Sequence, residues 1–270
     1  MKKVLYALLC VGLFCGGAGA DVKVGFLTRL NVTEDEYQDM VIAERKTAGW
    51  QLLSTKHEGE VDFVFYDSLI EMQMGLIGGY IDEAALPKVV AEYLLNTAPG
   101  FAVASAEQVK PVCLAFGFRP DSVALRDSFN TALRDMKTDG TLAALTEKYL
   151  AEPGMNAPAS VEFERFDSGE TIWVAVTGDL PPLDFVAEDG MPAGFNTAIL
   201  AEISRRLRRN IELLDISTGG RSAALASGRT DVVFWYRITP GEGRQIDVPE
   251  GILFSEPYYE WDKFLYIKKK

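Results

Sequence analysis

The chain has few of the residues that build metal sites, catalytic triads and disulfide frameworks. Its 270 residues include one histidine and three cysteines. His57 stands alone in a polar stretch, so a zinc site or a Ser-His catalytic pair has little to build on. Cys10 and Cys15 fall in the first 20 residues, which leaves Cys113 alone in the remainder. One cysteine cannot form an internal disulfide, so we expect Cys113 to be a small buried residue in a fold held by packing.

After its first 20 residues the chain lacks any apolar run long enough to span a membrane. Residues 1–20 combine two lysines, an apolar run and the tripeptide AGA before Asp21, which is the pattern of an export signal. A lipoprotein anchor at Cys15 is the alternative, but the preceding GLF is not the small-residue box that anchoring needs. We therefore expect a periplasmic or extracellular protein.

Positive charge is also scarce, with 27 basic against 39 acidic residues and a net charge of −12. The first 20 residues contain two of the basic residues and no acidic one, so the remainder has 25 basic and 39 acidic residues, a net charge of −14. Such an acidic surface disfavours nucleic acid and anionic lipid as partners.

Apolar runs and helix-spaced apolar residues alternate along the chain, which predicts an α/β fold. A proline-containing stretch without periodicity, residues 151–168, is the best linker candidate. Strands are expected at 22–27, 61–66, 81–86, 111–118, 171–176, 211–216, 232–236 and 260–267, and helices at 69–76, 89–95, 121–136, 142–150, 197–207 and 223–226.

The most informative stretch is residues 220–259, GRSAALASGRTDVVFWYRITPGEGRQIDVPEGILFSEPYY. It predicts a short helix stopped at Gly228, then a buried strand after Asp231, then a polar loop. The unbroken apolar run of that strand suits a parallel strand covered on both faces. Arg237 follows at the carboxyl end of the strand, where open α/β sheets bind ligands.

These motifs resemble those of the type II periplasmic solute-binding proteins, in particular the cluster that feeds polar amino acids to ABC transporters. The family string "ALxSGxxDVI…T-x-T-P-E-R…V-D-F-S-x-P-Y-Y" is matched at residues 224–259, and GDLPPL at 178–183 resembles the family's ligand loop "G-T-Y-P-P-F". GFN at 194–196 resembles "G-F-D", and residues 129–150 resemble the family's closing helices. The resemblance implies two lobes, each a central sheet flanked by helices, with a ligand cleft at the hinge.

The family's parts occur here in a rotated order, which predicts a circular permutation. The alternatives are a tandem array cut short and a fragment of a longer gene. In chain order, the predicted parts are a signal peptide (1–20), a second-lobe-like domain (22–105), a return hinge strand with closing helices (106–150), a linker (151–168), a first-lobe-like domain (169–259) and an outward hinge strand (260–270).

The resemblance also implies a ligand site, but this sequence departs from the family at its three anchors. The arginine that grips a carboxylate in the family falls on Glu242. The aspartate that receives an amino group falls on Pro87, with Lys88 next to it, and the aromatic before Pro-Pro falls on Leu180. Arg237, or Arg244 after a loop shift, can replace the lost cation.

Aromatic and helix-start residues complete the predicted site. Trp235 or Tyr236 can supply a stacking face, although Trp235 fits a core position equally well. Arg221 also maps near the cleft, but we expect Arg221 and Arg244 to be solvated surface residues, and Glu242 and Lys88 can be simple loop charges. The full predicted ligand-binding set is Arg237, Trp235, Tyr236, Thr239, Asp179, Leu180, Arg29, Thr33, Glu242 and Lys88.

The resemblance implies a monomeric, non-enzymatic solute-binding protein without cofactor or metal. It would carry a small, carboxylate-bearing ligand, such as an amino acid or organic acid, to an ABC transporter permease. A dehydratase-like enzyme on the same fold is the second hypothesis, with Glu242 and Glu83 as the acid–base candidates. A sensory or scaffold protein with a degenerate cleft is the third.

Overall fold

The computed structural model describes residues 22–27, 61–151, 160–167, 170–217, 220–238 and 251–270. The chain alternates strands and helices. Before the midpoint these are β1 (Val22–Leu27), β2 (Val61–Tyr66), α3 (Leu69–Gly78), β3 (Glu83–Pro87), α4 (Lys88–Thr97), β4 (Phe101–Phe118) and α5 (Val123–Thr138). They continue as α6 (Thr141–Thr146), the π-helical turn η1 (Glu147–Ala151), β5 (Thr171–Val176), β6 (Asp179–Leu180), β7 (Asp184–Val186), β8 (Pro192–Ala193), α7 (Phe195–Leu207), β9 (Asn210–Asp215), α8 (Arg221–Ala226), β10 (Val232–Ile238), β11 (Leu253–Phe254) and β12 (Tyr259–Lys269).

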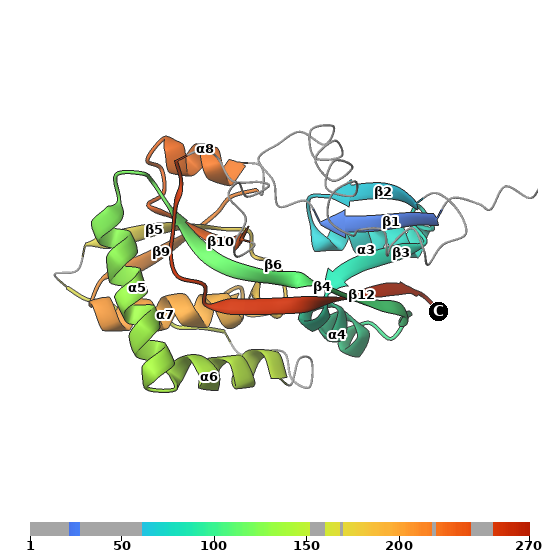
Figure 1. Ribbon diagram of the computed structural model, residues 1–270, viewed down its shortest axis with the longest axis horizontal. Coiled ribbons are helices and arrows are strands. Elements are labelled where there is room, and N and C mark those ends of the chain that lie inside the picture. The colour runs from blue at the N-terminus through green and yellow to red at the C-terminus, as the bar shows by residue number, and fades with distance from the viewer. Residues whose placement is uncertain (1–21, 28–60, 152–159, 168–169, 218–219, 239–250) are drawn as a thin grey trace, which may run out of the picture.

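Two lobes lie side by side in Figure 1, joined by the long strands β4 and β12. We call β1, β2, β3, α3 and α4 the small lobe. The large lobe contains α5 to α8 and β5 to β10. The two-lobed α/β fold predicted from the sequence is confirmed, and no described helix is long and apolar enough to cross a membrane.

One continuous sheet runs through both lobes in the order β2-β1-β3-β12-β4-β10-β5-β9. The first three of these strands are parallel to one another, as are β10, β5 and β9. Strands β4 and β12 pair with each other antiparallel, from Tyr259 opposite Leu114 to Lys269 opposite Phe101. Each lobe therefore has three parallel strands beside this antiparallel pair.

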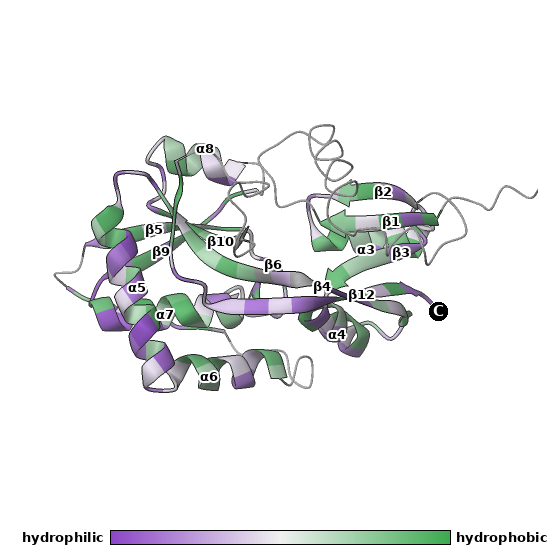
Figure 2. Cartoon of the chain, in the orientation of Figure 1, coloured by the Kyte–Doolittle hydropathy of each residue, from purple (hydrophilic) through white to green (hydrophobic). Residues whose placement is uncertain are grey.

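Helices close the two faces of the sheet in the large lobe, with α8 on one side and α7 on the other (Figure 1). Hydrophobic colour lies on β3 and on the large-lobe half of β4, whereas β12 and α5 show hydrophilic residues (Figure 2). The aromatic core sits where β4 meets α5. There the ring of Phe116 stacks on Tyr258 at 4.6 Å and meets Phe129 edge-on at 5.4 Å. Such pairs add to the free energy gained from apolar burial.

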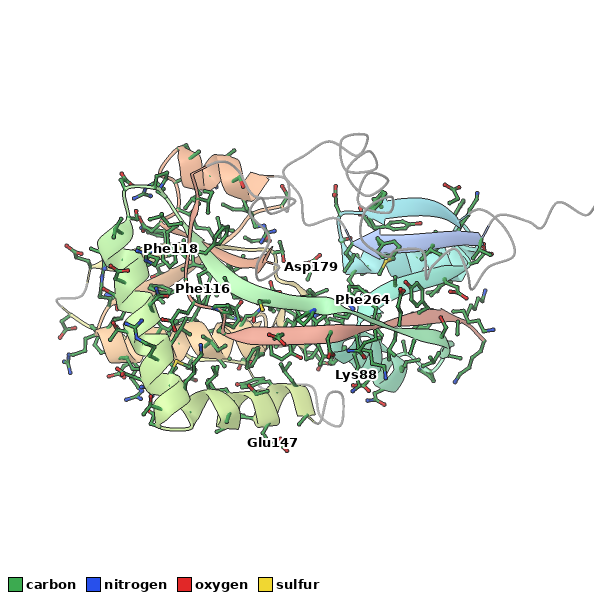
Figure 3. All side chains as sticks on the ribbon, in the orientation of Figure 1. Lys88, Phe116, Phe118, Glu147, Asp179 and Phe264 are labelled. Atoms are coloured by element: carbon green, nitrogen blue, oxygen red, sulfur yellow. The ribbon has the colours of Figure 1, made fainter. Side chains whose placement is uncertain are left out.

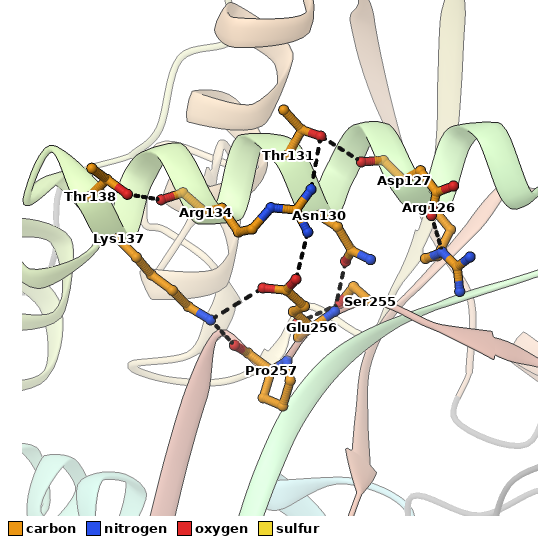
Figure 4. A network of polar contacts seen from close by, with 10 residues as sticks. All are labelled: Arg126, Asp127, Asn130, Thr131, Arg134, Lys137, Thr138, Ser255, Glu256 and Pro257. Atoms are coloured by element: carbon orange, nitrogen blue, oxygen red, sulfur yellow. Dashed lines mark hydrogen bonds and ion pairs between the residues drawn. The ribbon is translucent and has the colours of Figure 1, made fainter.

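Polar contacts fasten α5 to the segment that leads into β12 (Figure 4). Arg134 pairs with the Glu256 carboxylate at 2.7 Å, and Lys137 donates to the Pro257 carbonyl at 3.0 Å. The Asn130 side-chain oxygen accepts from the Glu256 amide at 2.7 Å. These contacts place the start of the crossing strand against a helix more than a hundred residues earlier in the chain.

The structure corrects three expectations from the sequence. The strand predicted at 111–118 begins ten residues earlier, at Phe101, because residues 101–108 pair with β12. The strand at 232–236 was expected to be a parallel strand, but β10 is parallel only to β5. Its other neighbour, β4, runs antiparallel to it. The end of the predicted linker is also packed: Val161 is buried and its amide donates to the Pro192 carbonyl at 2.8 Å.

Candidate ligand-binding cleft

The loop after β5 is held by a buried aspartate. Asp184 is 2% exposed, and its Oδ2 accepts from the Thr177 hydroxyl at 3.1 Å and from the Gly178 amide at 3.0 Å. Gly178 has φ = 65°, which a glycine adopts without strain. The turn therefore brings β6 back over the carboxyl end of β5, where α/β sheets bind ligands.

A second glycine fixes the other end of this loop. Gly194 precedes α7 with φ = 107°, and a Cβ added there would lie 2.5 Å from the Leu183 carbonyl oxygen. No other residue type fits that contact without backbone movement. The β6–β7–β8 hairpin is thus fixed at both ends to the large lobe.

The small lobe meets this hairpin with the helices α3 and α4. Helix α3 contacts β6, and the Tyr93 ring on α4 lies 6.3 Å from the Phe185 ring on β7. Helix α3 is capped by Ser68, whose Oγ accepts from the Glu71 amide at 3.2 Å. The hairpin is therefore one place at which the two lobes contact each other.

Buried polar side chains lie in the core of the large lobe. Arg221 is 2% exposed, and its Nη1 donates to the Phe234 carbonyl at 2.9 Å. Tyr258 is buried too, and the pKa of its hydroxyl is raised well above the usual value, mainly by burial and next by the charge of Asp184, while Arg221 opposes this rise. Tyr258 is therefore a neutral, buried hydroxyl at physiological pH.

The expectation that Arg221 is a surface residue is wrong. Its guanidinium reaches the backbone of β10 from the first turn of α8, so the residue is part of the core. Sequence reasoning also missed Asp184 and Tyr258. Asp184 directly follows GDLPPL, and Tyr258 is the first tyrosine of the matched string F-S-x-P-Y-Y, and these positions were the only signal for them.

Of the predicted ligand-binding residues, three have described side chains. Asp179 lies between the lobes in Figure 3, whereas Leu180 beside it is 2% exposed in the hydrophobic core. Lys88 opens α4, and its Nζ lies 2.6 Å from Glu92 Oε2. Figure 3 places Lys88 and Asp179 on opposite sides of the β4–β12 ribbon, so the structure does not bring these two together.

The other predicted residues are described only in part or not at all. The backbone of β10 places Tyr236 opposite Ala115 and Arg237 opposite Leu114 on β4. Their side chains and that of Trp235 lie outside the described residues, as do Arg29, Thr33, Thr239 and Glu242.

The acid–base candidate Glu83 is found in the small lobe. It opens β3 and raises the pKa of the Tyr266 hydroxyl, although burial and the hydrogen bond to Glu107, at 2.7 Å, raise it more. Glu242, the second candidate, lies outside the described residues. Within the part of the chain that the structure describes, no cluster of histidine, cysteine and carboxylate side chains could hold a metal ion.

The sequence of the large lobe from β5 onward, together with β12, is similar to that of a known protein family. Residues 172–270 match the family model of the bacterial extracellular solute-binding proteins, family 3. For this stretch, the resemblance predicted from the sequence is confirmed, and the match supports a ligand-binding protein. No curated protein sequence matches the chain.

Solved structures with a similar arrangement share little sequence with this chain. They include full-length CbnR complexed with its target DNA (12% identity, TM-score 0.42, covering 94% of this chain and 65% of CbnR). The zinc-bound ligand-binding component of an ABC-type import system from Staphylococcus aureus has 10% identity and a TM-score of 0.43, with 92% and 65% covered. The alkanesulfonate-binding protein SsuA from Xanthomonas axonopodis pv. citri, bound to MOPS, has 10% identity and a TM-score of 0.41, with 93% and 66% covered.

The chain thus spans less than two thirds of the length of these three proteins. Because each TM-score is below 0.5, the likenesses carry no argument about the ligand. Function is inferred instead from the family match and from the geometry of the two lobes.

Proposed function

We propose that this protein is an extracytoplasmic solute-binding protein that captures a small polar, carboxylate-bearing ligand between its lobes for an ABC transporter. The observation that carries the proposal is the meeting of α3 and α4 of one lobe with the β6–β7 hairpin of the other, across the paired strands β4 and β12. Two lobes joined by two strands can close around a solute by bending at the strands. The family match of residues 172–270 supports the same function.

Arg237 is the proposed anchor for the carboxylate. It lies on β10 directly opposite Leu114 of β4, close to where the crossing strands leave the large lobe. Arginine binds a carboxylate through two parallel hydrogen bonds, which gives geometric specificity as well as affinity. Asp179, at the lobe junction, is the proposed partner for a ligand amine or hydroxyl group.

No catalytic role is proposed. The acid–base candidate Glu83 opens a strand of the small lobe beside Tyr266 and Glu107 rather than on the hairpin where the lobes meet. The proposed carrier is a monomer that is exported by the segment 1–20 and delivers its ligand to a permease. Capture and release of the ligand require no chemical step.

We further propose that the order of the family's parts is rotated in this chain. The segment from β5 to β10, which belongs to the family-matching stretch, follows the helices α5 and α6 that pack on it. Arg206 on α7 pairs with Asp139, in the turn between α5 and α6, at 2.6 Å. Helices that close a lobe thus precede that lobe in the sequence, as a circular permutation predicts.

Thermal unfolding against a panel of amino acids, organic acids and short peptides tests the function. A ligand at about 100 times its dissociation constant adds about 2.7 kcal/mol, and this raises the midpoint by roughly 5–11 °C for a protein of this size. We expect a shift with a few related carboxylates, its loss in Arg237→Ala, and its retention in the matched control Arg229→Ala, which changes an exposed arginine before β10. The absence of a shift with every compound, or an equal shift in Arg237→Ala, would contradict the proposal.

A further inference from the structure

Two side chains in the core of the large lobe have polar atoms without a hydrogen-bond partner among the described residues. Asn196 on α7 is fully buried, and neither its Nδ2 nor its Oδ1 has such a partner. Tyr258, in the segment before β12, is 4% exposed, and its hydroxyl has none either. An unpaired buried polar group destabilises a fold, and nearly all such groups in proteins bond to the protein or to ordered water.

Asn196 does not cap its own helix. The first amides of α7 donate to carbonyls of the β6–β7 connection, with Phe195 bonded to Pro182 at 3.0 Å and Asn196 to Leu183 at 2.8 Å. The capping role that an asparagine side chain often has at a helix start is thus taken by backbone carbonyls. The side-chain amide of Asn196 therefore needs another partner inside the core.

The Tyr258 hydroxyl lies near the same helix start. Its ring is 6.4 Å from the Phe195 ring, in the first turn of α7. Asp184 directly follows Leu183, whose carbonyl accepts from the Asn196 amide. After burial itself, the charge of Asp184 is the next cause that raises the pKa of Tyr258. The two unpartnered groups therefore lie around the same short stretch of backbone.

The chemistry of this place favours a neutral ligand that both donates and accepts hydrogen bonds. In Asn196, Oδ1 accepts and Nδ2 donates, and the Tyr258 hydroxyl can do both. Asp184 and Arg221, both 2% exposed, act on this hydroxyl with opposite charges, so neither an anion nor a cation is favoured. Water meets these requirements, and globular proteins contain about one buried water molecule per 27 residues.

We propose that the large lobe encloses a water site at the first turn of α7, where an ordered water molecule bridges the Asn196 side-chain amide and the Tyr258 hydroxyl. This water joins the start of α7, which is bonded to the loop of residues 178–183, to the segment that leads into β12. Strand β12 is one of the two strands that connect the lobes (Figure 1). The inference does not depend on which ligand the lobes bind.

Replacing tyrosine by phenylalanine tests the proposal by the sign of the effect. If the Tyr258 hydroxyl bonds to water, Tyr258→Phe in the full chain should lower the thermal unfolding midpoint by about 2–4 °C, the shift for one net hydrogen bond in a protein of this size. If the hydroxyl has no partner, the same change should leave the midpoint unaltered or raise it. The matched control Tyr80→Phe changes a tyrosine of the small lobe that is 74% exposed and should have no effect.

Two further measurements locate the water. Asn196→Leu, with a side chain of nearly the same size, should also lower the midpoint. The double variant with Tyr258→Phe should lose less than the sum of the two single losses, because both groups bond to one water. A crystal structure of the full chain should show a water oxygen within about 3.2 Å of both side chains.

The proposal is wrong if Tyr258→Phe does not lower the midpoint relative to Tyr80→Phe, if the two single losses add fully, or if the crystal structure shows no water between Asn196 and Tyr258. Because Tyr258→Phe keeps the aromatic ring and its packing, it tests the proposal even where Asn196→Leu does not fold.

Discussion

The two lobes have the same strand pattern but differ in how their interiors are filled. In the large lobe, the largest fully buried side chains are mostly aromatic, whereas in the small lobe they are aliphatic. The large-lobe group, counted with β4, is Phe116, Phe118, Phe129, Phe195, Phe234, Leu114 and Leu133, and the small-lobe group is Met72, Leu76, Ile81 and Leu86. The outer side of α3 also exposes Ile70, Met74 and Ile77 to solvent.

The described ion pairs also differ between the two lobes. The turn between α5 and α6 is tied to α7 through Asp139 and Arg206, and α5 is tied to the segment before β12 through Arg134 and Glu256. In the described part of the small lobe, the ion pair of Lys88 with Glu92 lies within one helix and does not join two elements. The described ion pairs of the large lobe thus join elements that lie far apart in the sequence.

The largest expected effect is the loss of folding when the chain is divided after its first half. A fragment of residues 21–155 keeps the small lobe, β4 and the helices α5 and α6 but loses β10 and β12, the strands on both sides of β4. Phe116, Phe118 and Phe129 would then be exposed, and we expect a fragment without a cooperative thermal transition.

The same fragment tests the rotated order of parts. A tandem array or a fragment of a longer gene predicts that residues 21–155 form a complete domain with its own sharp transition and protease resistance. Circular dichroism and limited proteolysis of the fragment beside the full chain distinguish the two outcomes. Recovery of the transition on adding residues 156–270 in trans would further support the permutation.

A smaller effect is expected from deleting one aromatic ring in the large lobe. Phe116 is fully buried against Phe129 and Tyr258, so Phe116→Ala should lower the free energy of unfolding by about 3–5 kcal/mol. The control Ile70→Ala removes a side chain that is 67% exposed on the small lobe and should change it by less than about 0.5 kcal/mol. Denaturant titration measures both, and equal effects would show that the difference between the lobes is not energetic.

Much of the fold could be predicted because local patterns decide it. The apolar runs at 22–27, 61–66 and 171–176 are the strands β1, β2 and β5, and the helix predicted from Thr197 to Leu207 extends two residues further back as α7. The beginning of β4 could not be predicted, since residues 101–108 are held in a strand by β12, about 160 residues later in the chain. Such pairing leaves no local signal.

The candidate site was less predictable for a related reason. The sequence directed attention to the Pro-Pro loop, and Asp179 does lie at the lobe junction. The burial of Asp184 and Arg221 depends on where the hairpin and α8 fold back onto the sheet, which no spacing of residues reveals. The packing of Val161 against Pro192 of the hairpin was not predictable either, because it lies in a segment whose composition indicates a linker.

The smallest expected effect concerns the ionic contact between α5–α6 and α7. The Asp139 carboxylate accepts from the Thr141 amide at 3.0 Å and from Arg206 at 2.6 Å. Hydrogen bonds from Thr141, followed by the one from Arg206, lower the pKa of Asp139 to about 2. Since the pKa of an aspartate in an unfolded chain is about 3.9, the folded state favours the ionised form. The contribution to stability is therefore complete above about pH 4 and is lost as the pH falls through about 2.

Asp139→Asn should consequently lower the unfolding midpoint at about pH 6 and have a smaller effect at about pH 2.5. Because this carboxylate is exposed, screening keeps the difference small, and it should shrink further in high salt. Asp262→Asn, an exposed residue on β12, controls for the loss of one surface charge. Thermal unfolding of the three proteins at both pH values is the measurement. A pH-independent difference between Asp139→Asn and the unaltered protein would mean that the turn is held by its glycine, Gly140 at φ = 81°, and not by the ionic contact with Arg206.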